Sequence, residues 1–179
     1  MFAKTQRLIV RELQKKDAER LFQIAREPST YRFMPNYSDG YETPQDYLDD
    51  PNWFQEQDDS RDLFRGRYYA VALPDSDEII GVVARGLKET LNEIEIGYFI
   101  SEKHRRKGFG EEAVNALVDW CFGISDIPYV IATISCENVP SNKLIEKCKF
   151  QLLDKRTPMK HGQLMENESY FYYRRYRIE

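Results

Sequence analysis

The sequence predicts an α/β (α+β) fold, in which helices flank a mixed, mostly antiparallel sheet of six to seven strands. The first observation is a set of three stretches, 64–73, 78–88 and 93–100, that are rich in β-branched and aromatic residues and separated by turn signals. The second is a strong amphipathic helix behind them, which is expected to end at Gly123. The third is the element order β-α-α-β-β-β-α-β-α-β-β, which indicates an antiparallel meander rather than strict βαβ alternation.

Three elements are expected ahead of the meander. Residues 7–12 carry Leu8 and Val10 among charged neighbours, which predicts a half-buried strand. A helix is expected to begin at Asp17 and to end at Pro28, because proline cannot continue a helix. A short second helix is expected to start at 43–46, where a hydroxyl, a proline and an acid follow the capping-box pattern.

Four elements are expected behind the amphipathic helix. Residues 129–135 predict a buried strand and 138–147 a short helix. Strands near 150–155 and 169–177 complete the predicted sheet. The inward-facing residues at the end of the short helix are expected to be Leu144, Ile145 and Cys148.

The composition is that of an ordinary globular protein. The 179 residues are 41% hydrophobic and 31% charged, and no Pro/Gly/Ser-rich linker divides them, so one domain over 1–179 is expected. No apolar run is long enough to cross a bilayer and no signal-peptide core precedes a cleavage site, which predicts a cytoplasmic protein without a membrane partner. Three widely spaced cysteines and two histidines lack metal-site spacing, so no metal is expected.

Charge is distributed unevenly along the chain. Segment 37–62 holds nine acids and one base, Arg61, whereas a basic cluster lies at 103–107. These segments are either two binding surfaces of opposite sign or ordinary solvated faces. A nucleic-acid partner is not expected, because the basic patch is small and the net charge is −4.

The sharpest signal is the loop ahead of the amphipathic helix. Its residues are Arg105, Arg106, Lys107, Gly108, Phe109 and Gly110. Glycines let a ligand approach the backbone, and a helix start offers unpaired N–H groups and the positive end of its dipole. The three cations add charge that favours phosphates. We therefore expect an anion such as a pyrophosphate here.

Three interpretations of this loop are open. It is a basic surface turn with a helix cap, a dinucleotide fingerprint, or part of a coenzyme A site. Gly108-x-Gly110-x-x-Ala113 formally matches the dinucleotide pattern. That motif normally follows the first strand of a long parallel sheet, whereas an antiparallel meander precedes the loop here.

The third interpretation is a family resemblance. The loop matches the R/Q-x-x-G-x-G/A coenzyme A signature of the GCN5-related N-acetyltransferases (GNAT), and Glu112-Ala113 resembles the E-A of their ribosomal-protein-alanine/serine (RimJ/RimL-type) branch. Residues 95–100, Glu-Ile-Gly-Tyr-Phe-Ile, look like that branch's E-I-G-Y-W-L strand. Residues 138–150 resemble its N-x-x-S…L-x-E-K-x-G-F segment. The resemblance covers nearly the whole chain.

The resemblance implies acetyl-CoA as co-substrate and a monomer or homodimer. It implies that the loop binds the pyrophosphate, and that Asn138 and Ser141 lie near the pantetheine arm and its sulfur. It also implies that backbone groups of Phe99, Ile100 and Ser101 pair with pantetheine as an added strand would.

Two departures from the family pattern stand out. Lys149 replaces the glycine of K-x-G-F, which suggests a different turn into the next strand. Ile145 stands where many relatives place a tyrosine that protonates the departing thiolate.

The chemistry of amine acylation then selects candidate catalytic residues. An aliphatic amine is mostly protonated near pH 7 and must lose a proton before it attacks a thioester. We expect Glu95 to be the general base, directly or through a water; the alternative is a solvated strand carboxylate, with Glu93 as its twin. Ser141 is the candidate hydroxyl beside the leaving thiolate, or else a serine that satisfies the first turn of a helix. Tyr98 is expected to be a core aromatic.

The acceptor is expected to be cationic. The acidic segment lies between the first two expected helices, which the resemblance places over the acceptor end, with Met34, Tyr37 and Glu95 as acceptor-binding residues. A protein N-terminal α-amine, a polyamine and an aminoglycoside all fit. The alternative function is a non-catalytic acyl-CoA-binding or interaction module on the same fold.

Overall fold

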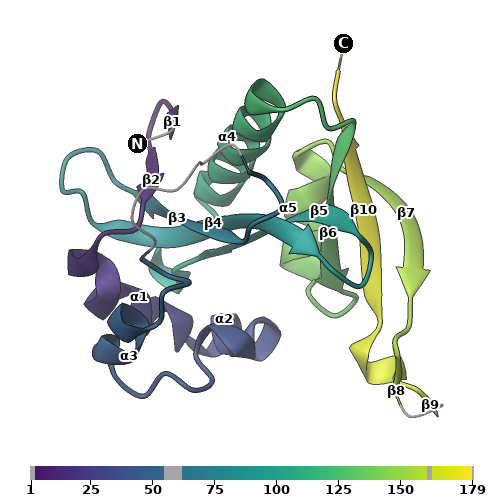
Figure 1. Ribbon diagram of the computed structural model, residues 1–179, viewed down its shortest axis with the longest axis horizontal. Coiled ribbons are helices and arrows are strands. Elements are labelled where there is room, and N and C mark those ends of the chain that lie inside the picture. Colours follow the sequence, from purple (N-terminus) through teal and green to yellow (C-terminus); the bar gives the residue numbers. More distant parts are fainter. Residues whose placement is uncertain (1–2, 55–61, 161–162, 179) are drawn as a thin grey trace.

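The computed structural model describes residues 3–54, 62–160 and 163–178. Within these residues, one sheet has the strand order β1-β2-β3-β4-β5-β6-β10-β7, and all neighbours are antiparallel except β5 and β6 (Figure 1). Its strands are β1 (Ala3–Lys4), β2 (Ile9–Glu12), β3 (Arg67–Ala72), β4 (Ile79–Lys88), β5 (Glu93–Ile100), β6 (Tyr129–Ser135), β7 (Gln151–Arg156) and β10 (Tyr170–Tyr176). A separate hairpin pairs β8 (Met159–Lys160) with β9 (Gln163–Leu164).

Helices cover both faces of the sheet, with α4 on one side and α1, α2 and α3 on the other (Figure 1). The α-helices are α1 (Ala18–Ala25), α2 (Pro28–Phe33), α3 (Pro44–Asp49), α4 (Phe109–Ile124) and α5 (Val139–Lys147). Short 3₁₀ turns lie at Lys15–Asp17, Pro35–Tyr37, Glu102–His104 and Glu166–Glu168. Leu117 of α4 and Ile145 of α5 share one apolar core, and Leu21 of α1 and Tyr47 of α3 share a second. The sheet therefore separates two cores.

The predicted architecture is confirmed, with two differences. The sheet has eight strands because 3–4 pair with 9–10 as an additional edge strand. Pro28 does follow the end of α1, but it also occupies the first position of α2, where its missing N–H costs nothing. The predicted capping box at Thr43 is present at the start of α3.

The sequence suggests that Lys149, in place of glycine, gives a different turn after α5, but the turn is the one that glycine would form. Its φ is +64°, the left-handed conformation that glycine adopts most easily. Phe150 N–H donates to the Ile145 carbonyl oxygen across this turn at 3.2 Å. The lysine thus takes the backbone conformation of a helix-ending glycine.

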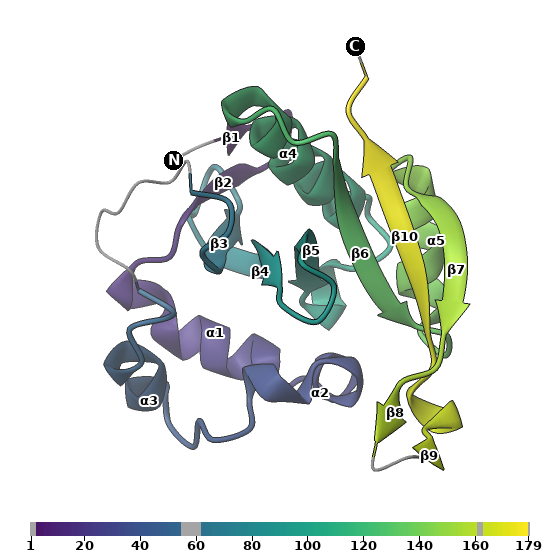
Figure 2. The same cartoon turned by 45° about the vertical axis from the view of Figure 1, so that its right-hand side comes forward.

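The parallel pair β5 and β6 diverges. A single residue pair, Glu95 with Ile131, joins the two strands, whereas β4 pairs with β5 along its full length. Figure 2 shows β6 running beside β10, with β5 on its other side. The backbone edge of β5 after Glu95 is therefore left without a partner strand among the described residues.

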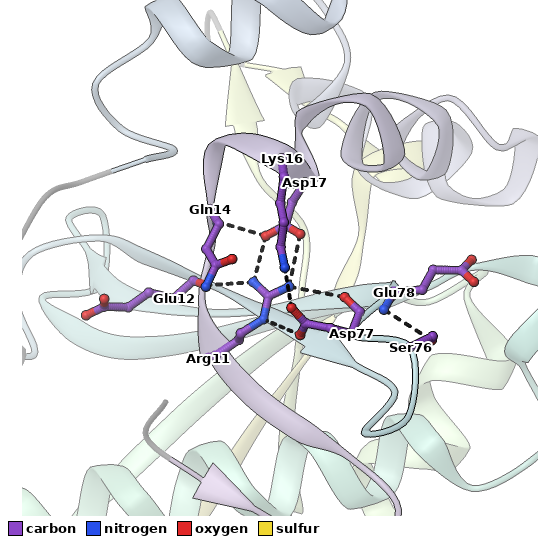
Figure 3. Close-up of polar contacts among 8 residues, drawn as sticks. All are labelled: Arg11, Glu12, Gln14, Lys16, Asp17, Ser76, Asp77 and Glu78. Atoms are coloured by element: carbon purple, nitrogen blue, oxygen red, sulfur yellow. Dashed lines mark hydrogen bonds and ion pairs between the residues drawn. The ribbon is translucent and has the colours of Figure 1, made fainter.

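A buried arginine joins β2 to the turn between β3 and β4 (Figure 3). Arg11 donates to both carboxylate oxygens of Asp17 at 2.7 and 3.0 Å and to Asp77 Oδ1 at 2.8 Å. Burial opposes the charge of Arg11, but hydrogen bonds to Asp17 and Asp77 outweigh it and raise the pKa of Arg11. Asp17 lies at the predicted N-cap position of α1, but its side chain makes no capping hydrogen bond to that helix. Its carboxylate instead holds Arg11 and so anchors the start of α1 to the sheet.

No helix among the described residues combines the length and the apolar character required to cross a membrane. No group of their His, Cys, Asp and Glu side chains is arranged to hold a metal ion. Cys121 and Cys148 are buried free thiols, and Cys136 is partly exposed.

Candidate cofactor and acceptor site

The glycine loop forms a concave backbone turn at the start of α4. Gly108 is the N-cap of the helix and has φ +82°, and Arg106 is also left-handed at φ +58°. Within the described part of the chain, the amides of 106–111 donate no hydrogen bond. Unpaired amides in such a turn, at the positive end of a 16-residue helix, are suited to an anion.

Arg7 supports this loop from the strand β2 side, a role that sequence reasoning missed. Its Nη1 donates to the Lys107 carbonyl oxygen at 2.8 Å, and its Nη2 pairs with Glu112 Oε2 at 2.6 Å. A Cβ on Gly108 would lie 3.1 Å from Arg7 Nη2. Glycine is thus favoured at 108 by its φ, and a Cβ there would also push the Arg7 side chain aside by a few tenths of an ångström.

Gly110 is needed for packing. A Cβ at this position would lie 2.7 Å from Leu144 Cδ1 of α5 and 3.6 Å from Ile100 Cγ1 of β5. The glycine therefore lets α5 approach the first turn of α4, next to Phe109, which packs at the edge of the same core.

The three loop cations differ in their surroundings. Arg105 Nε donates to the Ile100 carbonyl oxygen at 2.6 Å, and its Nη2 donates to Thr30 Oγ1 of α2 at 3.1 Å. Lys107 Nζ donates to the Lys103 carbonyl oxygen at 3.0 Å. Arg106 is exposed and, within the described ranges, has no hydrogen-bond partner. Arg105 thus ties the loop to α2, and Arg106 is the cation most available to a ligand.

The loop is an electropositive environment. Burial first, and then the charges of Lys103 and Lys107, lower the pKa of His104 below its usual range. Nearby positive charge disfavours the protonated imidazole. The same positive charge favours a bound anion.

Only alternate residues at the end of β5 direct their backbone N–H and C=O groups to the open edge of the strand. Ser101 N–H donates to the Ile80 carbonyl oxygen at 2.8 Å, so Ser101 and Phe99 direct their backbone groups toward β4. The groups of Ile100 and Tyr98 alternate with these and face the divergence from β6. Ser101 Oγ also donates to Glu27 Oε1 at 2.6 Å. Tyr98 is therefore a better placed pairing partner than Ser101.

Glu95 lies where β5 and β6 part. Thr133 of β6 donates a hydrogen bond to Oε1, and Lys88 Nζ lies 3.1 Å from Oε2. The carboxylate already holds one ammonium group, and the Lys88 side chain is 39% exposed. Both features are those of a carboxylate that can bind an incoming amine.

Glu93, the alternative candidate for the general base, is held by hydrogen bonds to other strands of the sheet. Its oxygens accept hydrogen bonds from Tyr129 at 2.9 Å, Tyr172 at 2.8 Å and Arg174 at 2.6 Å. Burial opposes its charge, but these hydrogen bonds outweigh burial and lower the pKa of Glu93. A carboxylate held in this way is a poor base.

Ser141 and Asn138 lie together at the start of α5. Asn138 caps the helix, because its Oδ1 accepts from the Ser141 amide at 3.4 Å. The Ser141 hydroxyl lies 2.6 Å from the Tyr98 hydroxyl of β5. The structure thus brings together Ser141, Asn138 and Tyr98, although the sequence indicated Tyr98 only as a core aromatic.

Tyr37 packs on the face of β5 that carries Glu95. It also lines a pocket of about 200 Å³. Burial first, then Tyr68 and Glu95, raise the pKa of Tyr37, whose hydroxyl is 3.6 Å from where a Cβ on Gly97 would lie. Met34 packs at the margin of the same core. The pocket is lined by Asn36, Tyr37, Tyr41, Asp50, Asn52, Trp53, Arg65, Gly66 and Tyr68.

Part of the acidic segment serves local structure. Asp46 accepts from the Glu42 and Thr43 amides in the capping box of α3. Asp50 accepts from Tyr41 and from Asn52. The remaining acids include Glu56, Asp58 and Asp59, which lie outside the described residues together with Arg61. The acidic rim expected at the acceptor end thus contains Asp50 at the pocket wall.

Comparison with known proteins adds to this geometry. The family model described as acetyltransferase (GNAT) domain matches residues 7–151, which include β5, the loop, α4 and α5. The uncharacterized N-acetyltransferase p20 from Bacillus licheniformis is 29% identical over 158 residues, 82% of this chain and 80% of that protein. The GNAT-family acetyltransferase from Bacillus anthracis has a TM-score of 0.76 at 23% identity over 98% of both chains. The structure of AAC(6′)-Ib in complex with paromomycin and acetyl-CoA has a TM-score of 0.72 at 15% identity, over 95% of this chain and 93% of that one.

Proposed function

Because the chain belongs to the GNAT acetyltransferase family, and is an acyl-CoA-dependent N-acetyltransferase, we propose that it moves the acetyl group of acetyl-CoA onto a primary amine of a cationic acceptor. The amine attacks the thioester directly, with Glu95 as general base. The observation that carries the proposal is the set of unpaired amides at 106–111, at the positive end of α4.

Acetyl-CoA would lie across the divergence of β5 and β6. The amides of the loop and Arg106 would hold the pyrophosphate, and the open edge at Tyr98 would pair with pantetheine. Asn138 and Ser141, at the start of α5, would lie beside the arm and its sulfur. The thioester would then lie between Glu95 on one face of β5 and Ser141 on the other.

Glu95 would bind the acceptor as an ammonium and then take its proton. The position of Lys88 Nζ, 3.1 Å from Oε2, is supporting geometry for such an ammonium. Lys88 would turn toward solvent when the acceptor enters. The deprotonated amine attacks the carbonyl carbon, and the C–S bond breaks as the tetrahedral intermediate collapses.

The acceptor would lie along Tyr37 and Met34, with its remaining groups in the pocket that Asp50 borders. A protein N-terminal α-amine, a polyamine and an aminoglycoside are the acceptor classes we propose. The motifs at 95–100 and 138–150 favour the ribosomal-protein acetylating branch. A cytoplasmic location and a monomer or homodimer stay predictions.

An assay of free-thiol release from acetyl-CoA with a panel of amines tests the proposal. We expect release that depends on the amine and one acetylated product for each thiol. The panel contains peptides with Ala or Ser at the first residue, spermidine and an aminoglycoside. If acetyl-CoA binds in a titration but no amine releases thiol, the alternative of a non-catalytic acyl-CoA-binding module is correct.

A further inference from the structure

Position 145 is an isoleucine in this chain, where the family pattern that the chain resembles often has a tyrosine that protonates the leaving thiolate. Ile145 is fully buried in the core between α5 and the sheet. No proton donor can therefore come from position 145. A hydroxyl from another element reaches α5 one turn before Ile145, because Tyr98 of β5 contacts Ser141.

The Tyr98 hydroxyl contacts two oxygen atoms of Ser141. The Tyr98 hydroxyl lies 2.6 Å from Ser141 Oγ and 3.1 Å from the Ser141 carbonyl oxygen. A tyrosine hydroxyl has one hydrogen to donate, and a serine hydroxyl has one hydrogen and two lone pairs. The Tyr98 hydroxyl donates to the Ser141 carbonyl oxygen, and either hydroxyl can donate in the 2.6 Å contact. When Tyr98 turns its hydrogen to Ser141 Oγ instead, the serine hydrogen is free to point to a third group.

Tyr98 is held as a neutral donor. Burial raises the pKa of Tyr98, and the hydrogen bond with Ser141 only partly opposes this effect. The phenol therefore keeps its hydrogen across the working pH range. Its aromatic ring packs against the core that α4 and α5 share, so the hydroxyl position is fixed by the fold.

We propose that Tyr98 is a positioning residue that directs the hydroxyl hydrogen of Ser141 to the sulfur of the departing coenzyme A. This inference rests on the proposed function. As the C–S bond breaks, its electron pair stays on sulfur, and Ser141 donates a hydrogen bond to the thiolate. Serine does not give up its proton, because a thiol with a pKa near about 8.5 is a far stronger acid than an aliphatic hydroxyl. The released thiolate takes its proton from water.

The test measures the pKa of the thiol of enzyme-bound coenzyme A. The ultraviolet absorbance of the thiolate reports this pKa during a pH titration. A hydrogen bond to the thiolate lowers the pKa of the bound thiol. We expect Tyr98→Phe and Ser141→Ala each to raise that pKa by about one unit relative to wild type, and the double variant to raise it no further.

Tyr173→Phe is the matched control. Tyr173 is buried and donates to Asn142 Oδ1 of α5 at 3.0 Å, so the variant also removes a hydroxyl that contacts this helix. We expect it to leave the pKa of the bound thiol unchanged. Single-turnover acetyl transfer should slow about tenfold in Tyr98→Phe and Ser141→Ala, with acetyl-CoA affinity retained.

Two outcomes would overturn the inference. One is an identical pKa of bound coenzyme A in wild type and Tyr98→Phe. The other is an additive loss in the double variant, which would mean that the two hydroxyls act separately. Failure of the wild type to acetylate any amine would instead reject the proposed function, because the titration of bound coenzyme A needs no acceptor.

Discussion

At the scale of single residues, the two carboxylates of β5 are distinguished by their partners. Glu95 has one exchangeable ammonium and one hydroxyl, whereas Glu93 is bound by two tyrosines and an arginine. The sequence could not separate them, because Tyr172 and Arg174 are about eighty residues away from Glu93 and reach it only through the pairing of β10 with β6.

Substitution of these carboxylates tests the assignment. Glu95→Gln is expected to lower kcat about 100-fold and to remove the acidic limb of the kcat profile, because the amide cannot accept the proton. Glu93→Gln is expected to lower the melting temperature with little change in kcat. Steady-state kinetics over a pH series with both variants checks this. An unchanged rate and pH profile for Glu95→Gln would reject Glu95 as the base.

Lys149 offers a prediction on stability. A left-handed φ is unfavourable for a residue with a Cβ and costs about 1 kcal/mol. Lys149→Gly is expected to remove this cost, partly offset by the greater freedom of glycine in the unfolded chain, and to stabilise the protein by up to about 1 kcal/mol. Chemical denaturation measures the difference, and Lys147→Gly, inside α5, is the control that should destabilise.

At the scale of elements, the sequence predicted most of the local structure but not the long-range contacts. Periodicity and turn residues predicted 93–100 and 129–135 at their observed bounds. The helix α2 was missed, because Pro28 signals the end of one helix and the start of another equally well. Arg7 was missed as a loop support, because its partners Lys107 and Glu112 are distant in the chain.

The first turn of α4 should respond to acid through Glu112. Burial opposes the charge of Glu112, but hydrogen bonds from Thr5 and Arg7 outweigh it and lower the pKa of Glu112. The unfolded chain therefore binds this proton at higher pH than the folded chain does. The stabilisation is present above the unfolded pKa and is lost as pH falls through the folded pKa.

Melting temperatures measured from pH 7 down to pH 3 check this linkage. Glu112→Gln is expected to be less stable than wild type at pH 7, by about 1–2 kcal/mol, and to lose less stability than wild type below about pH 4.3. Parallel curves for the two proteins over the whole range would contradict the role given to Glu112.

At the scale of the whole molecule, the candidate base and the candidate hydroxyl beside the leaving thiolate lie on opposite faces of the sheet. Glu95, Tyr37 and the pocket lie with the core under α1 and α3, whereas Tyr98, Ser141 and Leu144 lie with the core under α4 and α5. The divergence of β5 from β6 is where the two sides meet. The motif resemblance pointed to this arrangement, but the parting of the strands after one residue pair is a tertiary feature that local sequence patterns do not encode.

Electrostatic steering would act at this scale. If the acidic segment 37–62 attracts a cationic acceptor, kcat/KM should fall as salt rises from about 0.05 M to 0.5 M, because the Debye length shortens below about 10 Å. The fall should be steeper for spermidine than for an amine with one positive charge. Equal salt dependence for both acceptors would argue against steering.

Binding of acetyl-CoA to glycine variants of the wild-type chain tests the central claim most directly. Isothermal titration is expected to give one site in wild type, at least tenfold weaker binding in Gly108→Ala, and unchanged binding in Gly123→Ala, where a Cβ meets nothing within 4 Å. Alanine at 108 would be strained at φ +82° and crowd Arg7, which displaces the amides from the ligand. Equal affinity in all three proteins, or none in wild type, would show that the loop at Gly108 does not hold the diphosphate.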